Sequence, residues 1–202
     1  MIDDYIALQV ALQRHLKRDD LTADIPDFIA SFEAAFNLEM RTADMEKVVT
    51  LVPDANGICD LPDDYLEWRT VNSNAPCSGE MQFIIPSVVA EKFSTNPGGM
   101  SRYFTIVGHE MGTYPASQTT IVLDYYAKVP ALTTVNTTNW LLSKAPNAYL
   151  YGSLLEAAPL ADAGDRVQLW GTHFDRAMAG LRKQDRGARY ARGRARVMGP
   201  TP

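Results

Sequence analysis

The chain has 202 residues, enough for one sizeable hydrophobic core or for a core that carries an inserted subdomain. Its composition, 46% hydrophobic and 21% charged, is that of an ordinary globular protein, and no apolar run approaches the roughly 18 residues of a membrane-spanning helix. The acidic start at Asp3 and Asp4 lacks the features of a signal peptide, so we expect synthesis in the cytoplasm and no membrane partner. In that compartment Cys59 and Cys77 are expected to be free, packed thiols.

Two helices are predicted in the first quarter of the chain, over residues 4–17 and 24–42. In both, apolar residues recur at the spacing of one helix face, and Pro26 suits the first turn of the second helix. We interpret both stripes as core. They consist of Tyr5, Leu8, Leu12 and Leu16 in the first helix and of Phe28, Phe32 and Phe36 in the second.

From residue 46 the period changes to that of strands. Short runs rich in β-branched and aromatic residues alternate with Pro, Gly and Asn, and Pro86 is placed to begin a short helix. We interpret the stretch between residues 107 and 121 as a connection. Strands are expected near residues 48–52, 58–61, 68–71, 81–85, 103–107 and 121–126.

After Pro130 the pattern is helical again, over residues 148–158 and 165–182. The first of these helices, which we expect Pro159 to close, is apolar nearly all round and contains the small residues Gly152 and Ser153. We expect it to be a packing hub, built on Tyr149, Leu150, Leu154 and Leu155.

The predicted fold class is therefore α+β, mainly α: a four-helix bundle with an inserted small antiparallel β subdomain. The predicted division of the chain is a helical half (1–45), the β subdomain (46–130), a second helical half (131–183) and a basic C-terminal arm (184–202).

Charge is distributed unevenly along the chain. Between Arg182 and Arg196 there are seven basic residues and one acid, a net charge of +6, whereas the rest of the chain holds 12 basic and 23 acidic residues, a net charge of −11. The segment can be a solvated end, a contact for nucleic-acid phosphate, or an arm that docks on an acidic partner or on the acidic bodies of its own neighbours. The asymmetry favours the arm, because bodies of like charge repel in an assembly. Its basic residues are Arg182, Lys183, Arg186, Arg189, Arg192, Arg194 and Arg196.

The sequence contains no pattern typical of an enzyme. His15, His109 and His173 have no metal-ligand spacing, and there is neither a nucleophile elbow at Ser153 nor a phosphate loop after Gly99. We expect no catalytic residue, no metal and no cofactor.

Four pieces of the chain, in order, resemble the head-to-tail adaptor (connector) proteins of tailed bacteriophages, most closely those of short-tailed phages and gene-transfer particles. The fullest is Asn139-Trp-Leu-Leu, followed by Pro146-Asn-x-Tyr-Leu-Tyr and Leu154-Leu-Glu-Ala-Ala. The other pieces are residues 60–69, 102–108 and 123–132.

The resemblance implies a structural virion protein of the phage neck, made in the host cytoplasm and acting in tail assembly and genome ejection. It implies a homo-oligomeric ring, a dodecamer, that joins the portal protein to tail or nozzle proteins around a channel for double-stranded DNA, bound non-specifically. The basic arm is then expected to grip the portal and to become ordered only on docking, and the β subdomain, with Trp68 and Tyr103, to face the tail. The alternative is a nucleic-acid-binding packaging protein that acts through the Arg-rich end.

Overall fold

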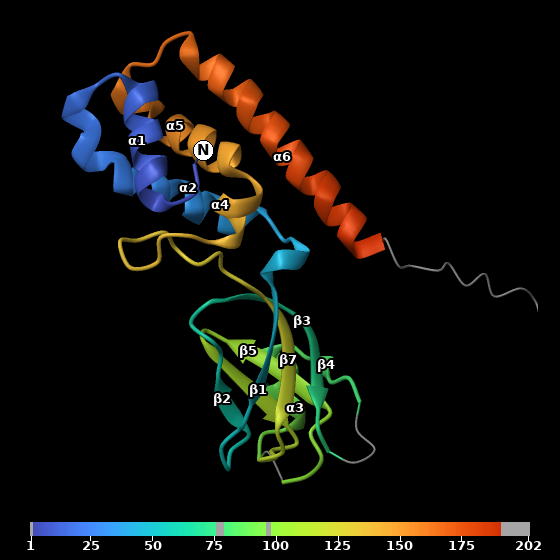
Figure 1. Cartoon of the computed structure of the whole chain (residues 1–202). Coiled ribbons are helices and arrows are strands. Elements are labelled where there is room, and N and C mark those ends of the chain that lie inside the picture. Colours follow the sequence, from blue (N-terminus) through green and yellow to red (C-terminus); the bar gives the residue numbers. More distant parts are fainter. Residues whose placement is uncertain (1, 76–78, 96–97, 191–202) are drawn as a thin grey trace, which may run out of the picture. The chain divides into compact units, whose positions relative to one another are not determined.

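The computed structural model describes residues 2–75, 79–95 and 98–190 (Figure 1). The chain divides into two compact units: a helical unit made of Met1–Asp44 with Val129–Pro202, and a β unit made of Met45–Lys128. We describe each unit by itself.

The helical unit is built around α5, which packs against α1, α2, α4 and α6. Figure 1 shows α5 between α1 and α6. Its elements are α1 (Tyr5–Leu16), η1 (Asp19–Asp24), α2 (Ile25–Glu39), α4 (Trp140–Lys144), α5 (Pro146–Ala161) and α6 (Arg166–Tyr190), and a short 3-10 turn, η2 (Ala43–Met45), follows α2.

Local chemistry sets the ends of these helices. The Asp4 carboxylate accepts a hydrogen bond from the backbone N–H of Ala7 at 2.7 Å and so caps α1, which ends at Lys17 in the left-handed region with φ of 54°. Pro26 and Pro146 occupy the first turns of α2 and α5, where a missing N–H costs nothing. The predicted helices 4–17 and 24–42 therefore match α1 and α2 closely.

The β unit holds two small sheets. The strand orders are β1-β7-β3 in one sheet and β2-β6-β5-β4 in the other. Its elements are β1 (Glu46–Leu51), β2 (Ile58–Asp60), β3 (Tyr65–Ser73), β4 (Gln82–Phe83), α3 (Pro86–Lys92), β5 (Tyr103–Val107), β6 (Glu110–Tyr114) and β7 (Ile121–Ala127). The two sheets share one buried core, which includes Val71, Phe104, Met111 and Leu123.

Two expectations for the β unit are wrong. The stretch between residues 107 and 121 is not only a connection, because β6 lies in it and pairs with both β2 and β5; Gly108, with φ of 63°, makes the turn from β5 to β6. The subdomain is also not purely antiparallel, because β4 runs parallel to β5.

Two expectations for the helical unit are also wrong. Pro159 does not close the hub helix, since α5 continues to Ala161 with this exposed proline inside its last turn. The last helix does not end at residue 182 but at Tyr190. The fold is a mixed α+β structure, as predicted.

Candidate assembly surfaces

A buried polar network holds the returning chain to the helical unit. Glu33 Oε1 accepts one hydrogen bond from the backbone N–H of Leu132 at 2.9 Å and another from the Tyr149 hydroxyl at 2.8 Å. Asn139 Nδ2 donates to the Tyr149 oxygen at 2.6 Å and to the Pro130 carbonyl at 2.8 Å. Two residues of the motif that carries the family resemblance, Asn139 and Tyr149, are thus hydrogen-bonded to each other.

The same asparagine also begins α4. Its Oδ1 accepts a hydrogen bond from the backbone N–H of Leu142 at 2.8 Å, so Asn139 is the N-cap of α4. This cap was not predicted. Burial raises the pKa of the Glu33 carboxyl, against the lowering effect of its hydrogen bonds with Leu132 and Tyr149. Burial and the neighbouring Glu33 charge raise the pKa of the Tyr149 hydroxyl. The network is enclosed and internally satisfied, so its role is to hold segments together.

The four residues expected to form the packing hub lie on α5. Tyr149, Leu150 and Leu154 are buried, whereas Leu155 is half-buried. Gly152 is a point of close approach between α5 and α2, because a Cβ placed there would lie 2.3 Å from Cδ2 of Phe32. The absence of a side chain at residue 152 therefore sets how closely these two helices pack.

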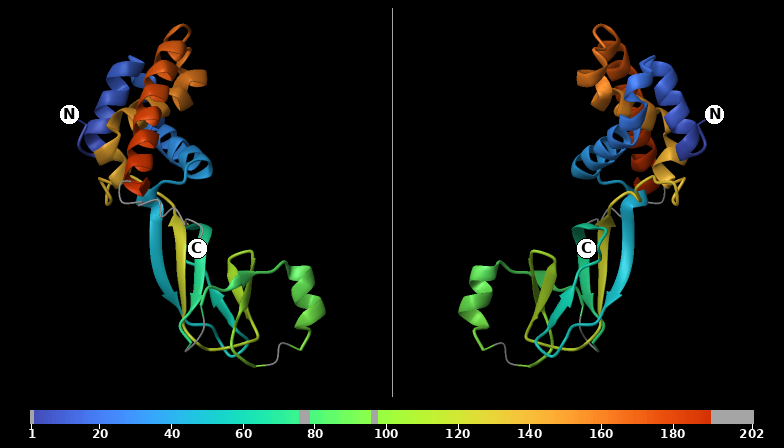
Figure 2. Two further views of the ribbon diagram at one scale, coloured as in Figure 1. Left: turned by 90° about the vertical axis from the view of Figure 1, so that its right-hand side faces the viewer. Right: turned by 90° about the vertical axis from the view of Figure 1, so that its left-hand side faces the viewer.

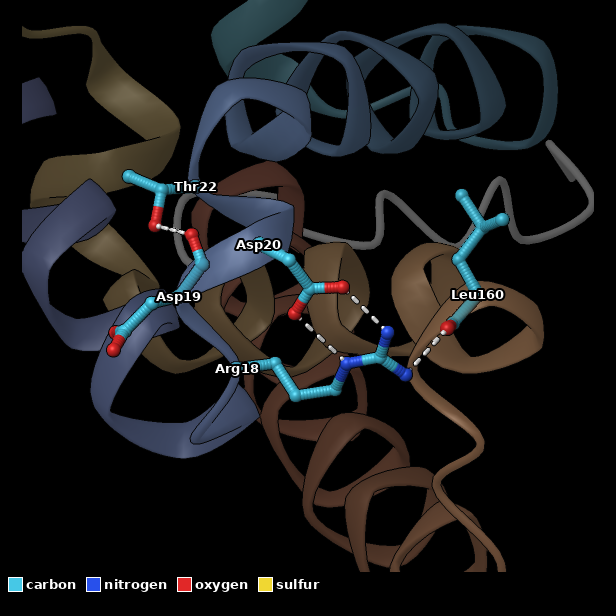
Figure 3. Close-up of polar contacts among 5 residues, drawn as sticks. All are labelled: Arg18, Asp19, Asp20, Thr22 and Leu160. Atoms are coloured by element: carbon cyan, nitrogen blue, oxygen red, sulfur yellow. Dashed lines mark hydrogen bonds and ion pairs between the residues drawn. The ribbon is translucent and has the colours of Figure 1, made fainter.

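Two arginines bind backbone carbonyls at the ends of α1 and α5, and Figure 3 shows the first of them, Arg18. Arg18 forms an ion pair with Asp20 at 2.5 Å, and its Nη1 donates to the Leu160 carbonyl at 3.2 Å. Arg166 donates to the carbonyls of His15 and Leu16 at 3.4 Å. Guanidinium groups suit the partially negative C-terminal ends of helices. The hydrogen bond from Arg18 holds the pKa of the Asp20 carboxyl below its usual range.

In the β unit, an ionic cluster lies on the sheet that contains β1, β7 and β3. Lys47 pairs with Asp64 at 2.6 Å, and the Tyr125 hydroxyl donates to the same carboxylate at 2.8 Å. Burial raises the pKa of Asp64, but these hydrogen bonds outweigh it and the net shift is downward. Arg69 pairs with Glu46 in the same sheet.

Trp68 and Tyr103, the residues expected to face the tail, belong to two aromatic clusters. Trp68 stacks on Phe83 with centroids 6.0 Å apart and meets Phe104 edge-on at 5.2 Å. Tyr103 packs against Phe93 at 5.9 Å. Trp68 and Tyr103 are both half-buried, so each contributes to packing and also presents surface.

The segment from β4 through α3 to residue 93 is apolar but unburied. No side chain of α3 is buried, and the exposed fractions of Phe83 and Ile85 are 43% and 53%. Figure 2 shows α3 at the outer edge of the β unit. Large apolar residues left outside a core mark surfaces that bind other proteins. A strand and a helix were predicted here from the residue pattern, but their exposure was not.

The basic residues of the expected arm differ in their surroundings. Arg182 is bound within the helical unit, to Glu39 at 2.7 Å, whereas Lys183 and Arg186 are exposed. The expectation that everything after Arg182 becomes ordered only on docking is wrong for residues 183–190, which continue α6. Arg189 lies on that helix. Arg192, Arg194 and Arg196 lie outside the described residues.

The part of the chain that the structure describes contains no grouping of three or more His, Cys, Asp or Glu side chains that could hold a metal ion. His15 and His173 instead pack against the ring of Tyr151, with centroid distances of 6.2 Å and 4.8 Å. Cys59 is buried and free, and burial raises the pKa of its thiol to about 11; Cys77 lies outside the described residues. Among the described helices, none is both long and apolar enough to cross a membrane.

The described residues thus form a helical unit and a small β unit, with apolar and charged side chains exposed on their surfaces. Residues 3–198 match the model of the SU10 adaptor protein family, and the chain belongs to that family. The expected class, a non-enzymatic phage adaptor protein with a structural role between head and tail, is confirmed by this membership. Comparison with curated proteins gives no match.

Proposed function

We propose that this chain is the subunit of a ring, a dodecamer, that joins the phage portal to tail or nozzle proteins and surrounds the DNA channel of the virion neck. Membership of the adaptor family over residues 3–198 is the observation that carries the proposal. A ring needs one face of each subunit to fit a different face of the next. The helices α1, α2, α5 and α6 are proposed to form a four-helix bundle that serves as the packing unit, with Tyr149, Leu150, Leu154 and Leu155 at its centre.

Trp68 and Tyr103 are proposed to lie on the tail-facing surface. In support, Phe83, which stacks on Trp68, is 43% exposed, and the neighbouring α3 has no buried side chain. Aromatic residues that are partly exposed are typical centres of protein interfaces. Rings of the Trp68→Ala variant should bind the portal normally and recruit tail proteins poorly. Normal recruitment by these rings would argue against this surface.

The basic arm is proposed to dock on the portal protein. Support comes from Lys183 and Arg186, which are exposed on the last turns of α6 while the rest of the chain carries a net charge of −11. Arg182 contributes less, because Glu39 already binds it. A contact of this kind should weaken steeply with salt.

The alternative is a packaging protein that binds DNA through the Arg-rich end, since a run of Arg favours phosphate. Deletion of the residues after Lys183 discriminates between the two. Under the adaptor proposal the shortened chain keeps its fold and loses affinity for the portal. Under the alternative it loses DNA retention, and portal binding is unchanged.

The direct test is mass photometry of the full chain, alone and mixed with the portal protein of the same phage. Addition of twelve subunits to each portal ring is the expected result, whether or not the free chain is a monomer. Absence of any complex with the portal, together with salt-dependent binding to DNA, would overturn the proposal in favour of the alternative.

A further inference from the structure

An apolar hollow of about 220 Å³ opens on the helical unit between α2, α5 and α6. Phe36, Met40 and Met178 are buried beneath it, and Leu155 and Phe174 stand half-buried at its sides. Sites for small molecules have volumes of about 300–1,000 Å³. The hollow therefore suits one or two aliphatic side chains from a protein segment.

The rim of the hollow is acidic. Glu39 on α2 and Glu156 on α5 both line it. Glu39 binds the guanidinium of Arg182 at 2.7 Å, and the same guanidinium lies 3.8 Å from Met40 Sδ. The exposed Glu156 has no ion-pair partner among the described residues. The rim thus binds one arginine and has a second carboxylate for another.

Residues 191–202, outside the described part, have the complementary chemistry. Three arginines alternate with small residues and are followed by Val197 and Met198, the only large apolar residues after Tyr190. An aliphatic pair next to arginines fits an apolar hollow edged by carboxylates, because charge-assisted hydrogen bonds at the rim can accompany apolar burial.

The reach of this segment decides which copy of the hollow it can enter. From Met178 to Tyr190, α6 advances about 18 Å at 1.5 Å per residue. A chain that turns back after Tyr190 uses residues 191–194 for a four-residue turn, and the three residues from 195 to Val197 then span about 10 Å when extended. The segment is too short to return to its own hollow, so the hollow of another copy is the available one.

We propose that residues 192–198 of each subunit dock in the α2–α5–α6 hollow of a neighbouring copy, with Val197 and Met198 inside it and an arginine on Glu156, beside the pair that Arg182 forms with Glu39. The contact is head-to-tail, as a closed ring requires. The inference rests on the proposed ring, and it narrows the portal-docking role to the part of the arm before residue 191.

Disulfide trapping in the full chain tests the proposal. The variant Leu155→Cys with Met198→Cys, on a Cys77→Ser background that keeps the buried Cys59, is oxidised both free and bound to portal rings. The expected product is a ladder of covalent dimers and larger multiples. A matched control pairs Met198→Cys with Val135→Cys, a residue of the same unit that is 94% exposed and does not line the hollow.

Each outcome decides the question. A ladder that forms at least several-fold faster than in the control, and is slowed by Glu156→Gln, supports the contact. A bond within one chain, equal rates in both variants, or no bond in either state overturns it. Because portal binding by the unmodified chain is measured separately, failure of the proposed function is distinguishable from failure of this contact.

Discussion

Gly152 on α5 lies so close to Phe32 on α2 that a Cβ at residue 152 would come within 2.3 Å of the phenyl ring. Phe32 in turn contacts the ring of Tyr149 at 5.1 Å, edge to face, so the glycine lies beside the aromatic centre of the helical unit. The small residue and the large ring form one packing unit, and neither can be changed alone without disturbing the other.

We expect Gly152→Ala to destabilise the helical unit by about 1–3 kcal/mol, because the added methyl group must displace Phe32 or separate the helices. Unfolding in urea, followed by circular dichroism, measures the change. The matched control is Gly180→Ala on α6, where nothing lies within 4 Å of an added Cβ. That variant should gain about 0.5–1 kcal/mol from helix propensity. Equal stability of Gly152→Ala and the unmodified protein would show that α2 and α5 pack less closely than described.

Replacing Tyr149 by Phe should cost about 1–3 kcal/mol, because Glu33 and Asn139 each lose a buried hydrogen-bond partner while the ring stays in place. The comparison variant is Tyr151→Phe, since the ring of Tyr151 is half-buried and packs against His15 and His173. Denaturant unfolding of the two variants should separate them clearly. Similar small losses in both would contradict the importance of the network.

The network also predicts a pH dependence. Because the pKa of Glu33 is raised in the folded state, the folded chain holds a proton that the unfolded chain has released, and stability falls as pH rises through the interval between the two pKa values. Glu33→Gln removes this contribution. The difference in unfolding free energy between the two proteins, measured from pH 4 to 7, should shift in favour of the variant as pH rises. A constant difference would mean that Glu33 has an ordinary pKa.

Phe83→Ser should leave the fold intact and reduce tail-protein recruitment at least several-fold, because it removes an exposed ring from the proposed tail-facing surface. Val107→Ser is the control, being an apolar residue of the same unit that is 59% exposed and lies at the end of β5. Pull-down of tail proteins by portal-bound rings provides the measurement. Equal losses in both variants would indicate a general effect of surface polarity.

The Cys59 thiol should react very slowly with thiol reagents in the native protein, since it is buried and its pKa is raised to about 11. On a Cys77→Ser background, labelling by a chromogenic disulfide at pH 8 should be at least tenfold slower in buffer than in denaturant. Rapid labelling of the native chain would show that the core around Cys59 opens readily.

Helix positions were predictable wherever apolar residues recur at one spacing, as in the stripe of Phe28, Phe32 and Phe36. The end of the last helix was not predictable, because no large apolar residue stands between Leu181 and Tyr190 to continue the stripe, although Arg and Ala favour helix on their own. The prediction that Pro159 ends its helix was also wrong. Near the end of a helix a proline removes only one of the few remaining backbone hydrogen bonds, so the helix can continue past it.

Strand β6 was missed because Gly112 interrupts an otherwise β-prone stretch, and its pairing with β2 depends on residues far away in the sequence. The buried, hydrogen-bonded position of Glu33 could not be predicted for another reason. A glutamate within a helix normally faces water, and nothing local to it indicates the hydrogen bonds from Leu132 and Tyr149, which lie about a hundred residues further on. The exposed basic and apolar surfaces were only partly predictable, since a sequence gives side-chain type but not burial.

Pairing of Glu46 with Tyr126 has a practical consequence for the chain. The strands by which the chain enters and leaves the β unit are antiparallel neighbours, so their ends lie only about 5 Å apart. A short loop could therefore replace the whole β unit without rerouting any helix, and a β unit from a relative could be grafted in its place. The helical unit and the β unit could then be exchanged independently of each other.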